Sequence, residues 1–272
     1  MNLYELIIKK IGFNNFFIKI ILQPICLLLK MNRFESLLDE AKTYKNIKFI
    51  DFVFYKFNIK NQAVFLNDDI FLSNKPFIIV ANHPTGLLDG LSIIHVLLKR
   101  NKKVKIVVNY LLKEFAQIHE ALGENFIYVN PFDHSKKKHL SYLGLKEIIK
   151  SLSNNEVVVF FPAGDISKIK GRKFNIADNE WNDTCIKFIN KSKITVVPVF
   201  IDSKNSSVFY LLNTLSNKIG LLFIFREFFN KCNTNVRLVF GNEFENQMFE
   251  NHQEMKKKLK DSVYQLKKDS YA

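Results

Sequence analysis

Short apolar runs rich in β-branched residues alternate along this chain with longer segments whose apolar residues recur at a helical period. The short runs predict buried strands, and the longer segments predict amphipathic helices. The predicted strands lie at residues 77–81, 103–109, 126–131, 156–161, 194–202 and 236–241, and the predicted helices lie at 91–98, 111–122, 133–152, 181–192 and 254–268. This alternation predicts an α/β fold, with a central mixed, mostly parallel sheet flanked by helices.

Some parts of the pattern are less regular. Residues 47–57 and 63–66 predict a small strand pair that precedes the core. Pro198 cannot donate a ladder hydrogen bond, so we expect its strand at a sheet edge or at a bulge. The apolar stretches 208–215 and 219–229 fit either the core or a lipid-facing surface. The last helix is basic, and we expect it to be exposed.

The N-terminal segment is strongly apolar between residues 16 and 30, but Lys19, Gln23 and Pro24 interrupt it. A helix that spans a bilayer needs roughly 20 clean apolar residues. We therefore expect membrane-interface helices at residues 1–45, which dock on the bilayer without crossing it, and an α/β domain at residues 46–272. The alternative is that these helices simply pack on the domain.

The loop after the predicted strand 77–81 is the first candidate for chemistry. Residues 82–90 contain one Pro and two Gly, so the strand ends in a tight loop. This loop carries His83 and Asp89 at the carboxyl end of a strand, where open α/β sheets place their chemistry. Asp89 can fix the tautomer of His83, whose other nitrogen can take a proton from a hydroxyl. The simpler interpretation of such a pair is a capping or turn arrangement.

Asn82, His83 and Asp89 resemble the first motif of the glycerolipid (lysophospholipid) acyltransferases, which include the bacterial lysophosphatidate acyltransferases. The form His-Pro-x-Gly-x-x-Asp-Gly is similar to a branch labelled hemolysin-like and related to O-acyltransferases of amino-acid lipids. It places five residues between His83 and Asp89, where the commonest form has four. The resemblance implies that His83 is the general base, that Asp89 orients it and that no covalent enzyme intermediate forms. Backbone N–H groups near Gly86 or Gly164 are then expected to stabilise the oxyanion.

Later stretches are similar to the other motifs of that family and follow in family order up to residue 202. In the third motif Ala163 and Ile166 replace the usual Glu and Arg, and a basic run that follows can cradle an anionic headgroup. The second motif lacks its usual Arg, and the fourth contains a Pro that is expected to shape the acyl pocket. The substrate-binding residues implied by the four motifs and the basic run are Asn82, Gly86, Asn130, Phe161, Pro162, Gly164, Ser167, Lys168, Lys170, Arg172 and Pro198.

The composition limits the kinds of partner that we expect for this protein. The formal net charge of +14 and the isoelectric point near 9.5 suit anionic lipid headgroups, an acidic carrier protein or nucleic acid. No nucleic-acid-binding motif accompanies the charge, so we expect no nucleic-acid partner. Cys26, Cys185 and Cys232 lie far apart, so neither a metal site nor a disulfide framework is indicated, and a reducing cytosolic setting fits.

These features predict an enzyme that moves a fatty acyl group from an acyl thioester to the hydroxyl of a lysolipid. The resemblance supplies the co-substrate, an acyl-carrier protein or coenzyme A thioester, and we expect neither a metal nor a bound cofactor. The acceptor is either lysophosphatidate or a lyso-amino-acid lipid, such as lyso-ornithine or lyso-glycine lipid. We expect a peripheral protein on the cytoplasmic face of the inner membrane. The alternative is a non-catalytic, hemolysin-like membrane-surface protein.

Overall fold

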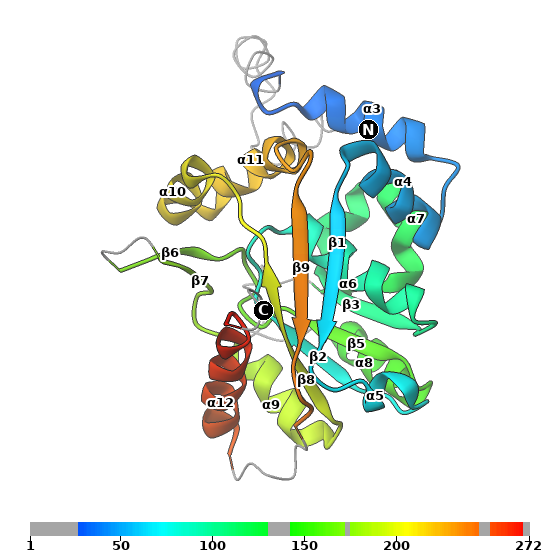
Figure 1. Ribbon diagram of the computed structural model, residues 1–272, viewed down its shortest axis with the longest axis vertical. Helices are drawn as coiled ribbons and strands as arrows, with labels where there is room; N and C mark the ends of the chain where they lie inside the picture. The colour runs from blue at the N-terminus through cyan, green and yellow to red at the C-terminus, as the bar shows by residue number, and fades with distance from the viewer. Residues whose placement is uncertain (1–26, 130–141, 172–174, 245–250, 269–272) are drawn as a thin grey trace.

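The computed structural model describes residues 27–129, 142–171, 175–244 and 251–268 (Figure 1). Within this part of the chain, seven strands form one sheet in the order β1–β9–β8–β2–β5–β3–β4. They are β1 (Lys60–Phe65), β2 (Ile78–Ala81), β3 (Val104–Asn109), β4 (Phe126–Val129), β5 (Val157–Phe160), β8 (Val196–Asp202) and β9 (Asn235–Phe240). Neighbouring strands run parallel except β8 and β9. The predicted mixed, mostly parallel sheet is confirmed.

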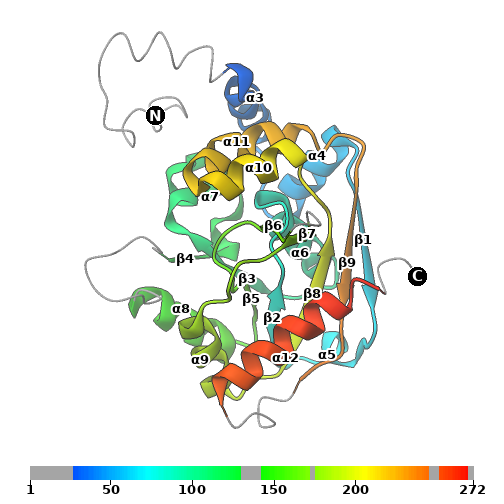
Figure 2. The same ribbon diagram turned by 90° about the vertical axis from the view of Figure 1, so that its left-hand side faces the viewer.

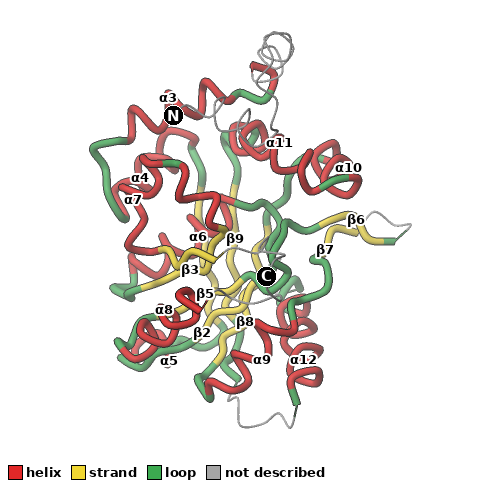
Figure 3. Tube along the Cα trace, turned by 180° about the vertical axis from the view of Figure 1, so that it is seen from behind, coloured by secondary structure: helices red, strands yellow, loops and turns green. Residues whose placement is uncertain are grey.

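Helices cover both faces of this sheet (Figures 2 and 3). On one face pack α3 (Met31–Ala41), α4 (Ile47–Phe57), α6 (Leu87–Lys99) and α7 (Ala116–Leu122), and on the other pack α8 (Tyr142–Ser153), α9 (Asp183–Ser192) and α12 (His252–Gln265). Alternate residues of β2 show the division, because Ile79 joins the first layer and Ile78 the second. A strand that is buried on both faces must be apolar throughout, which explains the unbroken run of apolar residues in β2.

The remaining elements lie at the ends of the sheet. α10 (Ser207–Leu215) and α11 (Asn217–Phe229) lie where β8 ends, and α5 (Asp69–Leu72) lies at the opposite end (Figure 1). The hairpin of β6 (Lys168–Lys170) and β7 (Asn175–Ala177) projects from the body of the molecule, and the 3₁₀ turns are Tyr110–Glu114 and Gly123–Asn125. α10 and the hairpin are in contact, since the Ile169 N–H donates to the Thr214 hydroxyl at 3.2 Å.

The prediction of a strand at residues 47–57 is wrong, because this segment forms the helix α4. Its buried residues are Phe49, Ile50, Val53, Phe54 and Phe57, a spacing that follows the 3.6-residue period of a helix. The aromatic and β-branched composition pointed to a strand, but the period decides the structure. The strand that follows, β1, pairs with β9 at the edge of the main sheet rather than with residues 47–57.

Pro198 lies inside the sheet, since β8 runs between β2 and β9. The expected edge position is therefore wrong, whereas the expected bulge is present. Val199 pairs with Phe240 and Val196 with Phe244, so three steps along β8 face four steps along its partner. The Pro198 carbonyl still accepts the Gly241 N–H at 2.9 Å. Proline is tolerated here because the antiparallel ladder is already irregular at its position.

The ends of the chain pack more closely than predicted. α12 is not simply exposed, since Met255, Leu259 and Val263 are buried against the second face of the sheet. Leu29 and the buried side of α3 belong to the same core as the first face. The described part of segment 1–45 thus packs with the α/β domain, and residues 1–26 lie outside the described residues. Among the described helices, none combines the length and the apolar character needed to cross a bilayer.

Candidate active site

The predicted site residues converge because β2, β5 and β8 are parallel neighbours in the sheet. Parallel strands that lie side by side end at the same edge, so the loops that follow them meet there. Residues 82–86 follow β2, residues 161–167 follow β5 and residues 203–206 follow β8. The first and third predicted motifs are joined directly, since the Ser167 N–H donates to the His83 carbonyl at 2.9 Å.

His83 and Asp89 lie together as predicted, with 2.9 Å between His83 Nδ1 and Asp89 Oδ2. The His83 side chain is 19% exposed and that of Asp89 is fully buried, so the imidazole alone faces solvent. The ring is turned so that its N–H does not align with the carboxylate oxygen, and the contact is a close polar approach rather than a linear hydrogen bond. Catalytic hydrogen bonds often align only when substrate binds.

Asp89 lies in the first turn of α6 rather than in the loop, because that helix begins at Leu87. Its Oδ2 accepts the N–H groups of Thr85 and Gly86, each at 2.8 Å, and its Oδ1 accepts the Thr85 hydroxyl. A carboxylate at a helix N-terminus is favoured by these free N–H groups and by the helix dipole. The capping interpretation is therefore correct, and it is compatible with catalysis because the cap holds Asp89 beside His83.

Gly86 is required at the start of α6. Its φ of +89° lies where side chains are strained, and an added Cβ would lie 2.9 Å from the Cδ1 atoms of Ile166 and Ile224. However, its N–H is already donated to Asp89, and the N–H of Gly164 is donated to the Phe161 carbonyl at 3.0 Å. Both N–H groups therefore have partners within their own loops, and the expectation that N–H groups near Gly86 or Gly164 stabilise the oxyanion stays a prediction.

Phe161 supports the other side of the histidine. Its ring stacks on the His83 imidazole with 4.2 Å between centroids and an interplanar angle of 23°. The neighbouring Pro162 is buried, and its carbonyl accepts the Asn182 N–H at 2.8 Å. Stacking restricts the ring to one plane, so Phe161 positions His83.

Asp178 is a residue that the sequence analysis missed, and it is 3% exposed. Its Oδ1 accepts the backbone N–H of His83 at 3.1 Å and the Ser167 hydroxyl at 2.6 Å. Its Oδ2 accepts the indole N–H of Trp181 at 3.1 Å. Burial raises the pKa of Asp178, and the Ser167 hydrogen bond opposes this effect. Asp178 thereby ties the two motif loops together. Nothing in its local sequence indicates this contact, which spans 95 residues.

Asn82 also holds the loop in place. Its amide nitrogen donates to the Ile201 carbonyl at 3.1 Å, and its amide oxygen accepts the Ile201 N–H at 2.7 Å. The side chain thus continues the β2–β8 ladder in place of backbone. Because both amide groups are used in this way, Asn82 is a positioning residue rather than the substrate contact we expected.

The other predicted binding residues are more dispersed. Gly164 is exposed with open space around it, and Lys168 lies 3.7 Å from Asp165. Lys170 donates to the Asn179 amide oxygen at 2.5 Å. Pro198 is buried within β8, away from the loops that carry His83, so the structure does not place it in an acyl pocket. Asn130 and Arg172 lie outside the described residues.

Comparison with known proteins identifies the family. The model of a protein family described as "Acyltransferase" matches residues 43–272. This chain belongs to that acyltransferase family. The prediction of an O-acyltransferase, rather than a non-catalytic membrane-surface protein, is confirmed.

Individual relatives of this acyltransferase are more distant. The chain is 27% identical over 197 residues to a lyso-glycine lipid O-acyltransferase of Bacteroides thetaiotaomicron, which covers 69% of this chain and 68% of that protein. It is 30% identical over 148 residues to a lyso-glycine lipid O-acyltransferase of Phocaeicola vulgatus, covering 53% of this chain and about half (48%) of that protein.

A solved structure shares the fold of this acyltransferase. It is the crystal structure of the 1-acyl-sn-glycerophosphate (LPA) acyltransferase PlsC from Thermotoga maritima, with a TM-score of 0.50. The match covers 86% of this chain and 83% of the other at 16% sequence identity. At this identity the likeness shows the fold alone, and it agrees with the predicted α/β class.

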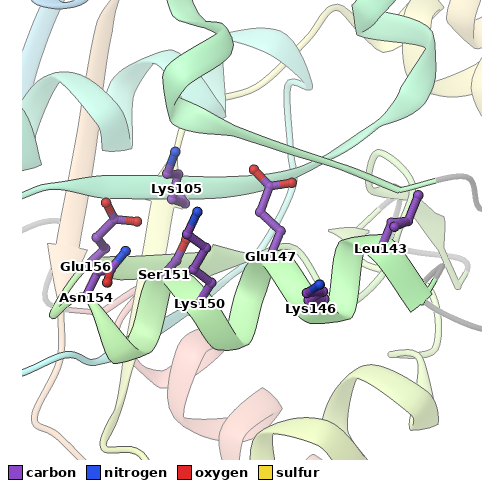
Figure 4. Close-up of a pocket in the computed structure, with 8 residues that line it drawn as sticks. All are labelled: Lys105, Leu143, Lys146, Glu147, Lys150, Ser151, Asn154 and Glu156. Atoms are coloured by element: carbon purple, nitrogen blue, oxygen red, sulfur yellow. The ribbon is translucent and has the colours of Figure 1, made fainter.

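A groove and a buried cysteine of this acyltransferase lie apart from the motif loops. A groove of about 400 Å³ runs along α8, lined by Lys105, Leu143, Lys146, Glu147, Lys150, Ser151, Asn154 and Glu156 (Figure 4). It contains none of the predicted site residues. Among the described residues, no group of three or more His, Cys, Asp or Glu side chains is placed to hold a metal ion. Burial raises the pKa of the Cys185 thiol to about 12, so this thiol is not an activated nucleophile.

Proposed function

We propose that this acyltransferase moves a fatty acyl group from a thioester to the hydroxyl of a single-chain lipid, with His83 as general base. The observation that carries this proposal is the partly exposed imidazole held between buried Asp89 and the ring of Phe161. With Nδ1 turned toward Asp89, Nε2 is the nitrogen left to face an acceptor. Within the described residues, Nε2 has no hydrogen-bond partner.

The proposed reaction is direct. His83 Nε2 takes the proton of the acceptor hydroxyl while that oxygen attacks the thioester carbon. The carbon–sulfur bond of the resulting tetrahedral intermediate breaks, and the imidazolium returns the proton to the leaving thiolate. Buried Asp89 stabilises the transient imidazolium, as the carboxylate of a catalytic triad does. No covalent bond to the enzyme is needed.

For the acceptor we favour a lyso-amino-acid lipid, of which lyso-glycine lipid is the first choice. Both relatives of known activity described above are lyso-glycine lipid O-acyltransferases. The third motif also lacks its usual Glu and Arg. Lysophosphatidate is the second candidate, because Lys168 and Lys170 follow that motif. Their contacts with Asp165 and Asn179 leave them less free to bind phosphate than the sequence alone implied.

The net charge of the protein supports a choice of acyl donor and of cellular location. A net charge of +14 suits an acidic acyl-carrier protein and the anionic cytoplasmic surface of the inner membrane. Coenzyme A thioesters are the alternative donor. Neither donor requires a bound metal or cofactor.

The test is a product assay on the full-length protein. Acyl-carrier-protein and coenzyme A thioesters are each offered with lyso-glycine lipid, lyso-ornithine lipid and lysophosphatidate, and products are identified by mass spectrometry. We expect a diacylated amino-acid lipid. Acylation of none of the lysolipids would contradict the proposal.

His83→Ala tests the role of the histidine in the same assay. We expect turnover to fall by about 10²–10⁴-fold, because general acid–base catalysis is typically worth that much. Asp89→Asn should be similarly severe, since an amide does not stabilise the imidazolium. Circular dichroism and a thermal melt establish that each variant is folded. A folded His83→Ala variant with near-parent turnover would show that another group is the base.

A further inference from the structure

The helices α10 and α11, at the end of the sheet, expose several large apolar side chains. We call Val208, Leu211, Leu215, Ile219 and Leu221 the α10–α11 surface, and each of these residues is 39–73% exposed. Val208, Leu211 and Leu215 are spaced at i, i+3 and i+7, so they lie along one face of α10. Contiguous exposed apolar side chains mark an interaction site more often than an ordinary protein surface.

α11 lacks the polar face that a surface helix normally has. Residues 221–225 are all apolar, and each is exposed or half-buried rather than buried. Among the described residues of this helix, only Gly220, Glu227 and Phe228 are buried. A helix that is apolar all round is normally surrounded by protein or lipid. Within the described residues, Leu222, Phe223 and Phe225 pack against the core on the inner side of α11, whereas Leu221 is 47% exposed.

The charge of this surface indicates which partner it fits. Glu227 is the only acidic residue between positions 207 and 229. It is 1% exposed, and its carboxylate accepts the N–H and hydroxyl of Ser206, each at 2.7 Å. The exposed side of α10 and α11 therefore carries no negative charge, while Arg226 is half-buried on α11 and Lys204 is exposed just before α10. Such a surface is compatible with anionic lipid headgroups.

This surface is also attached to the catalytic loop. The Tyr210 hydroxyl donates to the Pro84 carbonyl at 2.9 Å, and the Asn213 amide donates to the Ile166 carbonyl at 3.3 Å. Ile224 of α11 lies against Gly86. α10 and α11 thus cover the edge of the sheet at which His83 lies (Figures 1 and 2). A membrane that contacts their outer side would lie close to the active site.

We propose that the α10–α11 surface docks on the interfacial region of an anionic bilayer and brings His83 to its lipid acceptor. This inference rests on the proposed function, because a single-chain lipid acceptor resides in that bilayer. The apolar side chains enter the interface, and the neighbouring cations contact the headgroups.

Vesicle flotation of the full chain tests the proposal without donor or acceptor. We compare the parent with Leu211→Gln/Leu215→Gln on phosphatidylcholine vesicles that contain phosphatidylglycerol. We expect the double variant to bind about tenfold or more weakly, because two apolar side chains no longer enter the interface. The matched control is Leu72→Gln, since Leu72 is 78% exposed, Leu215 is 73% exposed, and α5 lies at the opposite end of the molecule. This control should bind like the parent.

A local probe identifies the contact itself. Leu215→Trp should be quenched by bromine-labelled lipid, whereas Leu72→Trp should not. Unquenched Leu215→Trp, or parent-like flotation of the double variant, would overturn the proposal. Unchanged flotation together with loss of a dimer in sedimentation would instead assign the surface to a second copy of this chain. Because flotation requires no turnover, its result is separate from that of the acyl-transfer assay.

Discussion

A small set of side chains around His83 decides whether its ring can act as a base. Asp89 approaches Nδ1, Phe161 restricts the ring plane, and Asp178 holds the backbone N–H of the same residue. Only Asp89 and Phe161 belong to the predicted motifs. The arrangement therefore depends on a buried carboxylate that no motif contains. Displacing a reacting group by about 1 Å can cost about a hundredfold in rate.

Asp178→Asn tests this dependence. The carboxylate accepts hydrogen bonds on both oxygens, whereas an amide accepts on one end only, so either the two loops or Trp181 must lose a partner. We expect kcat to fall roughly ten- to a hundredfold with little change in KM, because the base is misplaced rather than the acceptor released.

Steady-state kinetics on folded protein measure the effect of Asp178→Asn. Asp183→Asn is the control, because Asp183 is an exposed carboxylate on α9 that pairs with Lys256. It should keep the parent kcat. If Asp178→Asn also kept it, Asp178 would serve stability alone.

At the scale of elements, α4 and α6 are joined by a buried histidine rather than by apolar packing alone. His95 Nε2 lies 2.9 Å from Asp51 Oδ1, and the ring packs edge-on against Phe54 with 4.9 Å between centroids. Its Nδ1 lies 3.0 Å from the Asn61 amide nitrogen, so β1 is included in this contact. Burial lowers the pKa of His95, although the Asp51 hydrogen bond opposes that effect.

This lowered pKa predicts a pH dependence of stability. The folded state binds a proton at His95 less readily than the unfolded chain, whose histidine has a pKa near 6.5. The free energy of unfolding should therefore fall as pH drops below about 6.5 toward the folded pKa. Urea unfolding at pH 8 and pH 5.5 measures this change. His95→Gln should lose less stability over that range, and an equal loss in both proteins would assign the effect to other groups.

The β6–β7 hairpin carries Lys168 and Lys170 directly after the loop that follows β5. Lys168→Gln/Lys170→Gln should raise KM for an anionic substrate several-fold while kcat changes less, because ground-state attraction is lost. Lys146→Gln/Lys150→Gln changes the same number of charges in the groove along α8 and should leave KM unchanged. Equal KM values for all three proteins would make the hairpin lysines ordinary surface residues.

At the scale of the whole molecule, the segment that is tested for N-terminal membrane docking should be shorter than the predicted residues 1–45. Met31, Phe34 and Leu38 are buried in the main core, so removing α3 would expose the domain interior. The truncation to be tested is therefore that of residues 1–26, which retains α3. Lys19 would cost about 2.5–3.5 kcal/mol at the centre of a bilayer but stays hydrated at its interface.

We therefore expect the variant that lacks residues 1–26 to remain folded and to bind anionic vesicles more weakly. Binding of the parent should weaken with salt, because attraction to anionic lipid is worth about 1 kcal/mol per lysine and is screened. Protease access to sealed vesicles gives the direct check. Protection of Asn2 on the far side, with the domain outside, would show a spanning segment instead.

Local chemistry let the sequence determine a good part of this protein. Runs such as 77–81 and 156–161 are apolar because strands buried on both faces must be, and the Pro and Gly residues after them mark the loops. His83 and Asp89 are six positions apart, so a single turn of chain brings them together. The helical spacing of apolar residues in 47–57 was also present in the sequence. The prediction of a strand followed the aromatic and β-branched composition of that segment instead.

Only the tertiary structure decided the features that join distant segments. Asp178 meets His83 across 95 residues, and Asn82 meets Ile201 across 119. The tertiary structure also showed that the N–H groups of Gly86 and Gly164 are already donated, and that an internal strand accommodates Pro198 at a bulge. The apolar residues of α10 and α11 fitted either core or surface until their packing was known. Sequence patterns report the period and local chemistry of a segment, whereas these features depend on which other segments pack against it.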